Sequence, residues 1–173
     1  RGAAKTEFVT GSPNFDAYGK LQVSEAHSLG EYIQAYDDLP NVFGEVIGTG
    51  GTKVYSNDRR MTILSTNTAA SAAYKRSTHQ YHLYQAGKST LYEMTVALGD
   101  SGTTNIHREW GAYDDKNGLQ FHLEDLAFGV SLKSNSSGSV VNTTTLQADF
   151  NVDRMDGTNS VFNPSGLLLD LTK

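Results

Sequence analysis

Apolar and polar residues alternate through the middle of the chain, over residues 81–128. Every second position is apolar in two runs, one made by Tyr92, Met94, Val96 and Leu98 and the other by Leu119, Phe121 and Leu123. A glycine-rich stretch at 99–104 and an Asp-Asp-Lys-Asn-Gly loop at 114–118 separate the runs. Alternation interrupted by Gly, Asn and Asp is typical of half-buried antiparallel strands joined by tight turns. We therefore expect this block to form the centre of a β-sandwich.

The same pattern extends to both sides of this block. Further strands are predicted at 61–64, 78–84, 90–98 and 139–146, and alternation returns in Phe128, Val130 and Leu132 and in Leu167, Leu169 and Leu171. The total is roughly nine or ten short strands at a spacing of about 8 to 12 residues, as in sandwich domains. The predicted fold is an all-β, antiparallel β-sandwich of jelly-roll type, with at most one or two short helices.

Helical spacing occurs only near the N-terminus. Leu29, Tyr32, Ile33 and Tyr36 recur at that spacing within residues 24–43, and Pro40 would end the helix. An extended connection is the alternative. We expect residues 1–43 to form an arm or connector that packs on a neighbour, and residues 44–173 to form the sandwich domain.

Two glycines at 50–51 lie between short apolar runs at 45–48 and 53–55. This arrangement predicts a β-hairpin. A glycine loop that binds phosphate would need a helix directly after it, and the pattern predicts none there. Residues 66–74 fit either a helical turn or a strand edge.

Composition narrows the class of protein. The 173 residues are enough for one domain with a core, but only 38% are hydrophobic and 19% charged, because Gly, Ser, Thr and Asn are abundant. The formal net charge of −5 argues against a nucleic-acid-binding protein. The absence of cysteine excludes disulfides and thiolate sites. No apolar run approaches the roughly 18 residues that a membrane-spanning helix needs.

Two motifs suggest ligand chemistry but have simpler structural interpretations. Gly87-Lys88-Ser89 resembles the end of a phosphate-binding loop, but His82 occupies the position of its first glycine and a strand is predicted to follow. The loop at 114–118 begins like a calcium loop, but Leu119 and Leu126 replace two ligand positions. A hairpin that uses Asn117-Gly118 is preferred. A weak calcium site completed by another loop is the alternative.

The histidines show no pattern of metal ligands. His79 and His82 are predicted on opposite faces of one strand, so a single ion cannot readily contact both. His107 and His122 are predicted on different strands, with both rings facing solvent. We assign no metal, cofactor or catalytic residue.

No catalytic constellation is recognisable. Neither a G-x-S-x-G elbow nor an H-E-x-x-H pair occurs, and the carboxylates are scattered. Trp110, Tyr113 and the loop at 114–118 are the first places where a saccharide would stack.

Residues 76–173 resemble a family of structural proteins of tailed bacteriophages. The similarity lies in Tyr84-x-x-Gly87, Leu98-Gly99, Gly111-x-x-Asp114-x-x-Asn117-Gly118-x-x-Phe121, residues 130–134, residues 149–157 and residues 165–173. Ala86 stands where the family often has Pro. The resemblance implies a virion component with a jelly-roll sandwich similar to concanavalin-like domains, of the head or tail appendage, fibre or decoration type. Such chains commonly continue beyond the equivalent of Leu171, so a fragment or a divergent version is expected here.

The leading hypothesis is therefore a non-enzymatic structural component of a bacteriophage particle. Its expected partners are other virion proteins and copies of itself, with no nucleic acid and no membrane. Exposed strand edges and the N-terminal arm would make these contacts. The alternative is a carbohydrate-binding, lectin-like module at a receptor-binding tip, with a host-surface glycan as its partner. A glycan-degrading enzyme is the third hypothesis.

Overall fold

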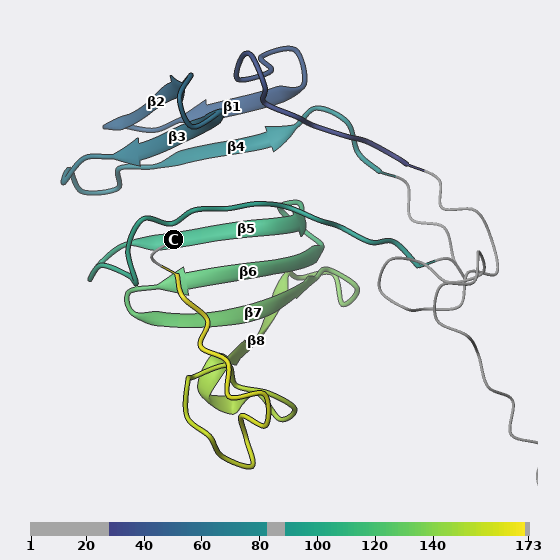
Figure 1. Cartoon of the computed structure of the whole chain (residues 1–173). Coiled ribbons are helices and arrows are strands. Elements are labelled where there is room, and N and C mark those ends of the chain that lie inside the picture. Colours follow the sequence, from purple (N-terminus) through teal and green to yellow (C-terminus); the bar gives the residue numbers. More distant parts are fainter. Residues whose placement is uncertain (1–27, 83–88, 172–173) are drawn as a thin grey trace, which may run out of the picture. The chain divides into compact units, whose positions relative to one another are not determined.

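The computed structural model describes residues 28–82 and 89–171 (Figure 1). The chain divides into two compact units, Arg1–Ala86 and Gly87–Lys173, which are described separately. The predicted Gly87-Lys88-Ser89 motif falls largely outside the described residues, as does the predicted arm before residue 28. Of the predicted helix at 24–43, residues 28–43 are described.

The described residues form eight strands: β1 (Phe43–Ile47), β2 (Gly51–Ser56), β3 (Met61–Thr66), β4 (Tyr74–Thr78), β5 (His107–Tyr113), β6 (Gly118–Glu124), β7 (Ala127–Ser134) and β8 (Val141–Leu146). All pairings between them are antiparallel. The one helical element in this part of the chain is a 3-10 turn at Gln147–Asp149. The all-β prediction is therefore confirmed. Within the same residues no helix is long and apolar enough to span a membrane.

The first unit contains two two-stranded sheets, β1-β4 and β2-β3. The predicted hairpin between 45–48 and 53–55 is therefore wrong, because these segments pair with different strands. Glu45 on β1 faces Arg76 on β4 in the register, and their side chains lie 3.6 Å apart. An opposite-charge pair across two strands contributes to the β1–β4 pairing, although Glu45 also contacts Lys53 of the nearer segment.

Residues 28–42 contain no helix, so that prediction is also wrong. Their backbone carbonyls bind side chains of β2 and of the β2–β3 turn instead: the Tyr55 hydroxyl donates to Gln34 O at 2.8 Å, and the Arg60 guanidinium donates to Ala35 O. In a helix these carbonyls would bind amides one turn further on. The Ile33 and Tyr36 side chains remain exposed, so no apolar face holds a helix in place.

A charge cluster fixes this segment to the first unit. The Lys53 ammonium contacts the carboxylates of Asp38 and Glu45, the latter at 2.8 Å. The hydrogen bond to Asp38, followed by the one to Glu45, raises the pKa of Lys53. The Arg76 guanidinium donates to the Asp38 carbonyl and lies 4.2 Å from the centre of the Phe43 ring. The described end of the predicted arm is thus bonded to the strands of the first unit.

The second unit is built on a four-stranded sheet with the order β5-β6-β7-β8 (Figure 1). The predicted hairpin at 114–118 is confirmed: Asp114 N donates to Asn117 O at 2.8 Å and closes the turn between β5 and β6. Gly118 has φ +136°, and a Cβ there would lie 2.4 Å from Ala112 O, so the turn requires glycine. A turn at 135–138, in which Gly138 N donates to Asn135 O at 3.1 Å, connects β7 to β8.

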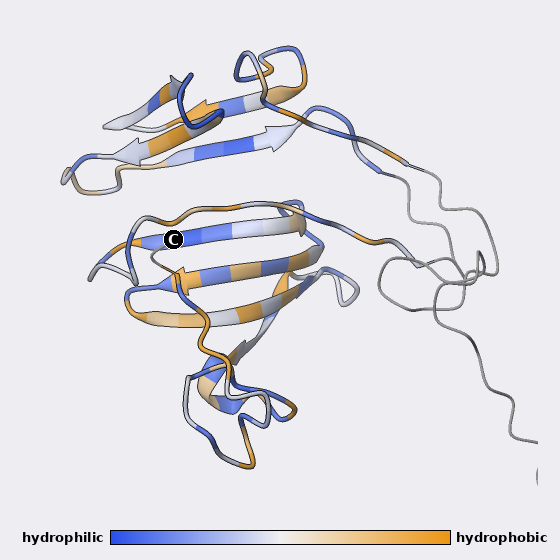
Figure 2. Ribbon diagram, viewed as in Figure 1, coloured by the Kyte–Doolittle hydropathy of each residue, from blue (hydrophilic) through white to orange (hydrophobic). Residues whose placement is uncertain are grey.

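Apolar and polar residues alternate along these strands (Figure 2), and the register therefore gives the sheet one apolar and one polar face. On the apolar face Trp110, Phe121 and Phe128 stack with ring centroids 6.0 to 6.2 Å apart. Phe150, which follows the 3-10 turn, meets the Phe128 ring edge-on at 6.4 Å. Leu123 and Phe128 are the buried apolar side chains of this small core.

Three other predicted strands are absent from the described residues. Residues 79–82 bend away after β4, and residues 90–98 pair with no strand although their sequence alternates. Near the C-terminus the Leu167–Leu169–Leu171 pattern produces a single bridge between Asp156 and Leu168. Alternating polarity indicates that a segment can adopt an extended conformation. A β-strand forms only where a neighbouring strand supplies its backbone hydrogen bonds.

Candidate functional site

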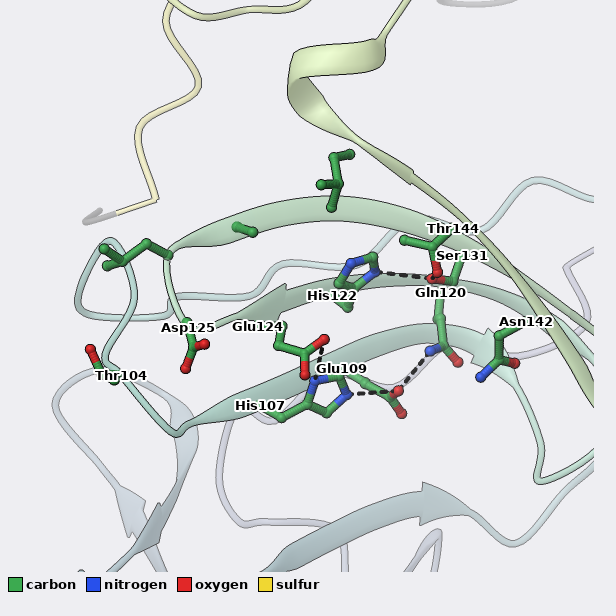
Figure 3. A pocket seen from close by; sticks show the side chains of 13 residues that line it. Thr104, His107, Glu109, Gln120, His122, Glu124, Asp125, Ser131, Asn142 and Thr144 are labelled. Atoms are coloured by element: carbon green, nitrogen blue, oxygen red, sulfur yellow. Dashed lines mark hydrogen bonds and ion pairs between the residues drawn. The ribbon is translucent and has the colours of Figure 1, made fainter.

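The polar face of the four-stranded sheet carries an open hollow of about 760 Å³ (Figure 3). The register explains which side chains meet there. Glu109 faces His122, and Gln120 faces Ser131, which in turn faces Thr144. Because paired residues share a face of the sheet, these side chains form neighbouring rows across all four strands.

A first group of polar contacts begins at the rim of the hollow and links residues of neighbouring rows. His107 Nε2 lies 2.8 Å from Glu109 Oε1, and His107 Nδ1 lies 4.0 Å from Glu124 Oε2. Gln120 Nε2 donates to the same Glu109 oxygen at 2.7 Å. Burial by itself raises the pKa of Glu109, but the contact with His107, the charge of Lys133 and the Gln120 amide together hold it below its usual value. Glu109 is therefore an anion at neutral pH.

A second group of contacts centres on His122, which is 4% exposed. Its Nδ1 lies 3.1 Å from Ser131 Oγ, and that hydroxyl lies 2.8 Å from Thr144 Oγ1. The ring sits above Gly129, where a Cβ would come within 2.7 Å of His122 Cε1. Burial, followed by the nearby charge of His107, lowers the pKa of His122, so the ring is neutral at physiological pH.

The Gln120 side chain is 2% exposed and only half satisfied. Its amide nitrogen binds Glu109, but its Oε1 is buried without a hydrogen-bond partner. The bond to Glu109 requires the NH₂ group on that side, so an amide flip cannot remove the mismatch. A buried acceptor without a donor is unfavourable by about 1–3 kcal/mol.

Tyr113 and Lys133 lie on the same face of the sheet as this hollow. Lys133 Nζ is 5.0 Å from the centre of the Tyr113 ring. Burial, assisted by the charge and hydrogen bond of Glu109, raises the pKa of Tyr113 to about 12. The phenol is therefore protonated at physiological pH.

The structure separates the residues predicted to contact a saccharide. Trp110 stacks with Phe121 and Phe128 on the apolar face, whereas Tyr113 lies on the polar face. In the loop, Asp114 Oδ1 accepts the backbone amides of Lys116 and Asn117 at 2.7 and 2.6 Å. These bonds, first the one from Asn117, lower the Asp114 pKa. The same oxygen therefore stabilises the hairpin turn.

The predicted histidine pairs have different outcomes. His107 and His122 do lie together, with stacked rings, but His122 is buried rather than exposed to solvent. His79 and His82 lie beyond the end of β4, not on a strand. Across residues 28–82 and 89–171 no three His, Asp or Glu side chains converge closely enough to hold a metal ion.

The side chains that line the hollow form hydrogen bonds with one another. Ser131 is 4% exposed, and its hydroxyl is shared between His122 and Thr144. The accessible groups are carboxylates, amides and hydroxyls. Sequence reasoning missed Glu109, Gln120 and Thr144. These residues occupy the polar positions of the alternating pattern in their strands. Once the register is known, such positions can be assigned to one shared face of the sheet.

Comparison with models of protein families, with curated proteins and with solved structures finds no match for this chain.

Proposed function

We propose that the chain is a non-enzymatic structural component of a bacteriophage particle and assembles with neighbouring subunits. The phage context rests on the sequence resemblance over residues 76–173. The assembly function has separate physical support in the apolar face of the β5–β8 sheet.

The observation that carries the proposal is an exposed apolar patch on that face, formed by Leu119, Phe121, Leu132 and Val141. Leu119 is 52% exposed, Leu132 53% and Val141 52%, whereas Gln120 and His122 on the opposite face are buried. Register places Leu119 directly beside Leu132 on the next strand. A sheet normally buries its apolar side chains and leaves its polar ones in water.

Covering this patch is favourable, because each square ångström of apolar surface removed from water contributes about 25 cal/mol. Contiguous exposed apolar surface commonly marks a protein interface. The neighbouring edge strand β8 adds a second means of contact. All six of its residues are exposed, and its sequence contains no charge or proline that would block pairing with another strand.

Light scattering coupled to size-exclusion chromatography tests the assembly function. We expect the chain to form a defined oligomer at micromolar concentration and Leu132→Asp to shift it to monomer, because the aspartate would place a charge in the contact. Leu126→Asp is the matched control, since Leu126 is an exposed leucine in the β6–β7 turn, away from the patch. A monomeric wild-type chain, or an equal effect of both variants, would contradict assembly through this face.

Mass spectrometry of purified particles tests the phage context independently. We expect peptides of this chain in fixed stoichiometry with the other virion proteins. Their absence from particles, even with an oligomer in solution, would restrict the proposal to an assembling protein of another kind.

A further inference from the structure

We infer that the hollow on the polar face of the β5–β8 sheet binds a neutral, polyhydroxylated ligand, that is, a saccharide. This site is distinct from the assembly patch because it occupies the opposite face of the same sheet. It also differs from the location first expected, since Trp110 belongs to the apolar face.

The buried Gln120 carbonyl is the strongest indication of a ligand. Its amide nitrogen is committed to Glu109, so Oε1 faces the other way and has no donor within the described residues. Figure 3 shows Gln120 and Asn142 projecting into the same region of the hollow. Asn142 is exposed on the edge strand β8, so its side chain can rotate without moving the sheet. The inference therefore includes a rotation of the Asn142 side chain that gives a hydroxyl donor of the ligand access to Gln120 Oε1.

The charges of the hollow select the class of ligand. Glu109, Glu124 and Asp125 all border it, so an anion such as phosphate is repelled. His107 lies between Glu109 and Glu124 and occupies the space that a cation would need. A ligand must donate to Gln120 Oε1 and also accept from the Asn142 amide. Hydroxyl groups do both.

The shape of the hollow fits the same class. Its volume of about 760 Å³ lies within the range of roughly 300 to 1,000 Å³ that small-molecule sites occupy. Leu146 and Ala127 contribute apolar wall between the polar groups, where the C–H surface of a sugar ring can pack. The hollow is thus lined by planar amides and carboxylates with apolar side chains beside them. This combination is suited to a sugar ring, which carries its hydroxyls on its edge.

A glycan array with neutral, acidic and amine-bearing glycans is the first experiment. We expect retention of neutral glycans and exclusion of sialylated and sulfated ones. The best neutral glycan is then titrated into ¹⁵N-labelled wild-type chain. Because Gln120 has a side-chain NH₂ group, its amide resonances should move together with those of Asn142. This readout does not depend on the folding of any variant.

Matched variants on the same strand complete the test. Asn142→Ala should weaken binding of that glycan about tenfold, because it removes a direct hydrogen-bonding group. Thr143→Ala, the next residue of β8 and directed to the opposite face, should leave affinity unchanged. The inference is overturned if no neutral glycan is retained, if only amine-bearing glycans bind, if the Gln120 resonances stay fixed, or if both variants lose affinity equally. The assembly proposal stands or falls separately, by the oligomeric state.

Discussion

The imidazole rings of His107 and His122 stack across β5 and β6, with centroids 6.4 Å apart and planes inclined by 19°. They are diagonal neighbours in the register, since His107 faces Glu124 and Glu109 faces His122. His107 is about half exposed, whereas His122 is buried. The two imidazole rings therefore lie on the same face of the sheet but differ in their exposure to solvent. A proton on His122 loses solvation and is repelled by a proton on His107.

The first prediction concerns the pH dependence of stability. The pKa of His122 is lower in the folded chain than its unfolded value of about 6.5. The neutral ring therefore stabilises the fold fully above about pH 6.5, and this contribution is lost as pH falls toward the lower folded pKa. We expect wild type to lose more resistance to urea between pH 7.5 and pH 5.0 than His122→Gln does.

Trp110, the single tryptophan, lies on β5 and reports this unfolding by fluorescence. The ionisable groups facing His122 are His107 and Glu109 from β5 and Glu124 from β6, while β7 and β8 supply Ser131 and Thr144. His79→Gln, at an exposed histidine of the first unit, is the control and should retain the wild-type pH response. An identical pH response of wild type and His122→Gln would disprove the assignment.

Gly129→Ala tests the contact beneath the His122 ring. The added Cβ would lie 2.7 Å from His122 Cε1 and 2.8 Å from the Thr145 carbonyl oxygen. We expect a loss of about 1–3 kcal/mol in the free energy of unfolding, measured by urea denaturation. In a His122→Ala background the same change should cost less, because the ring is gone while the Thr145 carbonyl remains. Equal costs in the two backgrounds would show that the ring does not contact this position.

Phe128→Ala tests the core. Phe128 is buried and contacts the rings of Trp110, Phe121 and Phe150. Truncation should lower the free energy of unfolding by about 3–5 kcal/mol. Phe162→Ala is the control: this ring is 49% exposed and contacts the Arg154 guanidinium, so its loss should cost about 1 kcal/mol or less. Comparable costs at both positions, measured by chemical denaturation, would rule out the aromatic cluster as the core.

Glu109→Gln tests the link between the carboxylate and the phenol of Tyr113. Burial raises the pKa of Tyr113 to about 12, and Glu109 adds to that rise. With the charge removed, the phenol should ionise at lower pH, but burial should keep its pKa above the ordinary value near 10. ¹³C NMR of labelled tyrosine rings up to pH 11, assigned with Tyr113→Phe, measures this. Glu124→Gln, at an exposed carboxylate, should leave the Tyr113 resonance in place; a shift as large as that caused by Glu109→Gln would refute the pairing.

The all-β class and the turn between β5 and β6 could be predicted from the order of the residues. The Asp-Asp-Lys-Asn-Gly loop formed the expected turn because Asp114 binds the amides next to it and Gly118 takes a conformation that few residues adopt. Both effects act within five residues. Alternation likewise located the segments of β6 and β7, since side chains of a strand point to opposite faces in turn.

The choice of strand partners and of the buried face is visible only in the folded chain. Residues 90–98 alternate as clearly as β6 does but form no strand, whereas β1 pairs with β4 rather than with the nearer segment at 53–55. The hollow contains Glu109, Gln120 and His122 because of the register of β5 against β6. A shift of one residue in that register would move the polar side chains of one strand to the opposite face of the sheet. Pairing and register arise from contacts between distant parts of the chain, and a local pattern of polarity does not encode them.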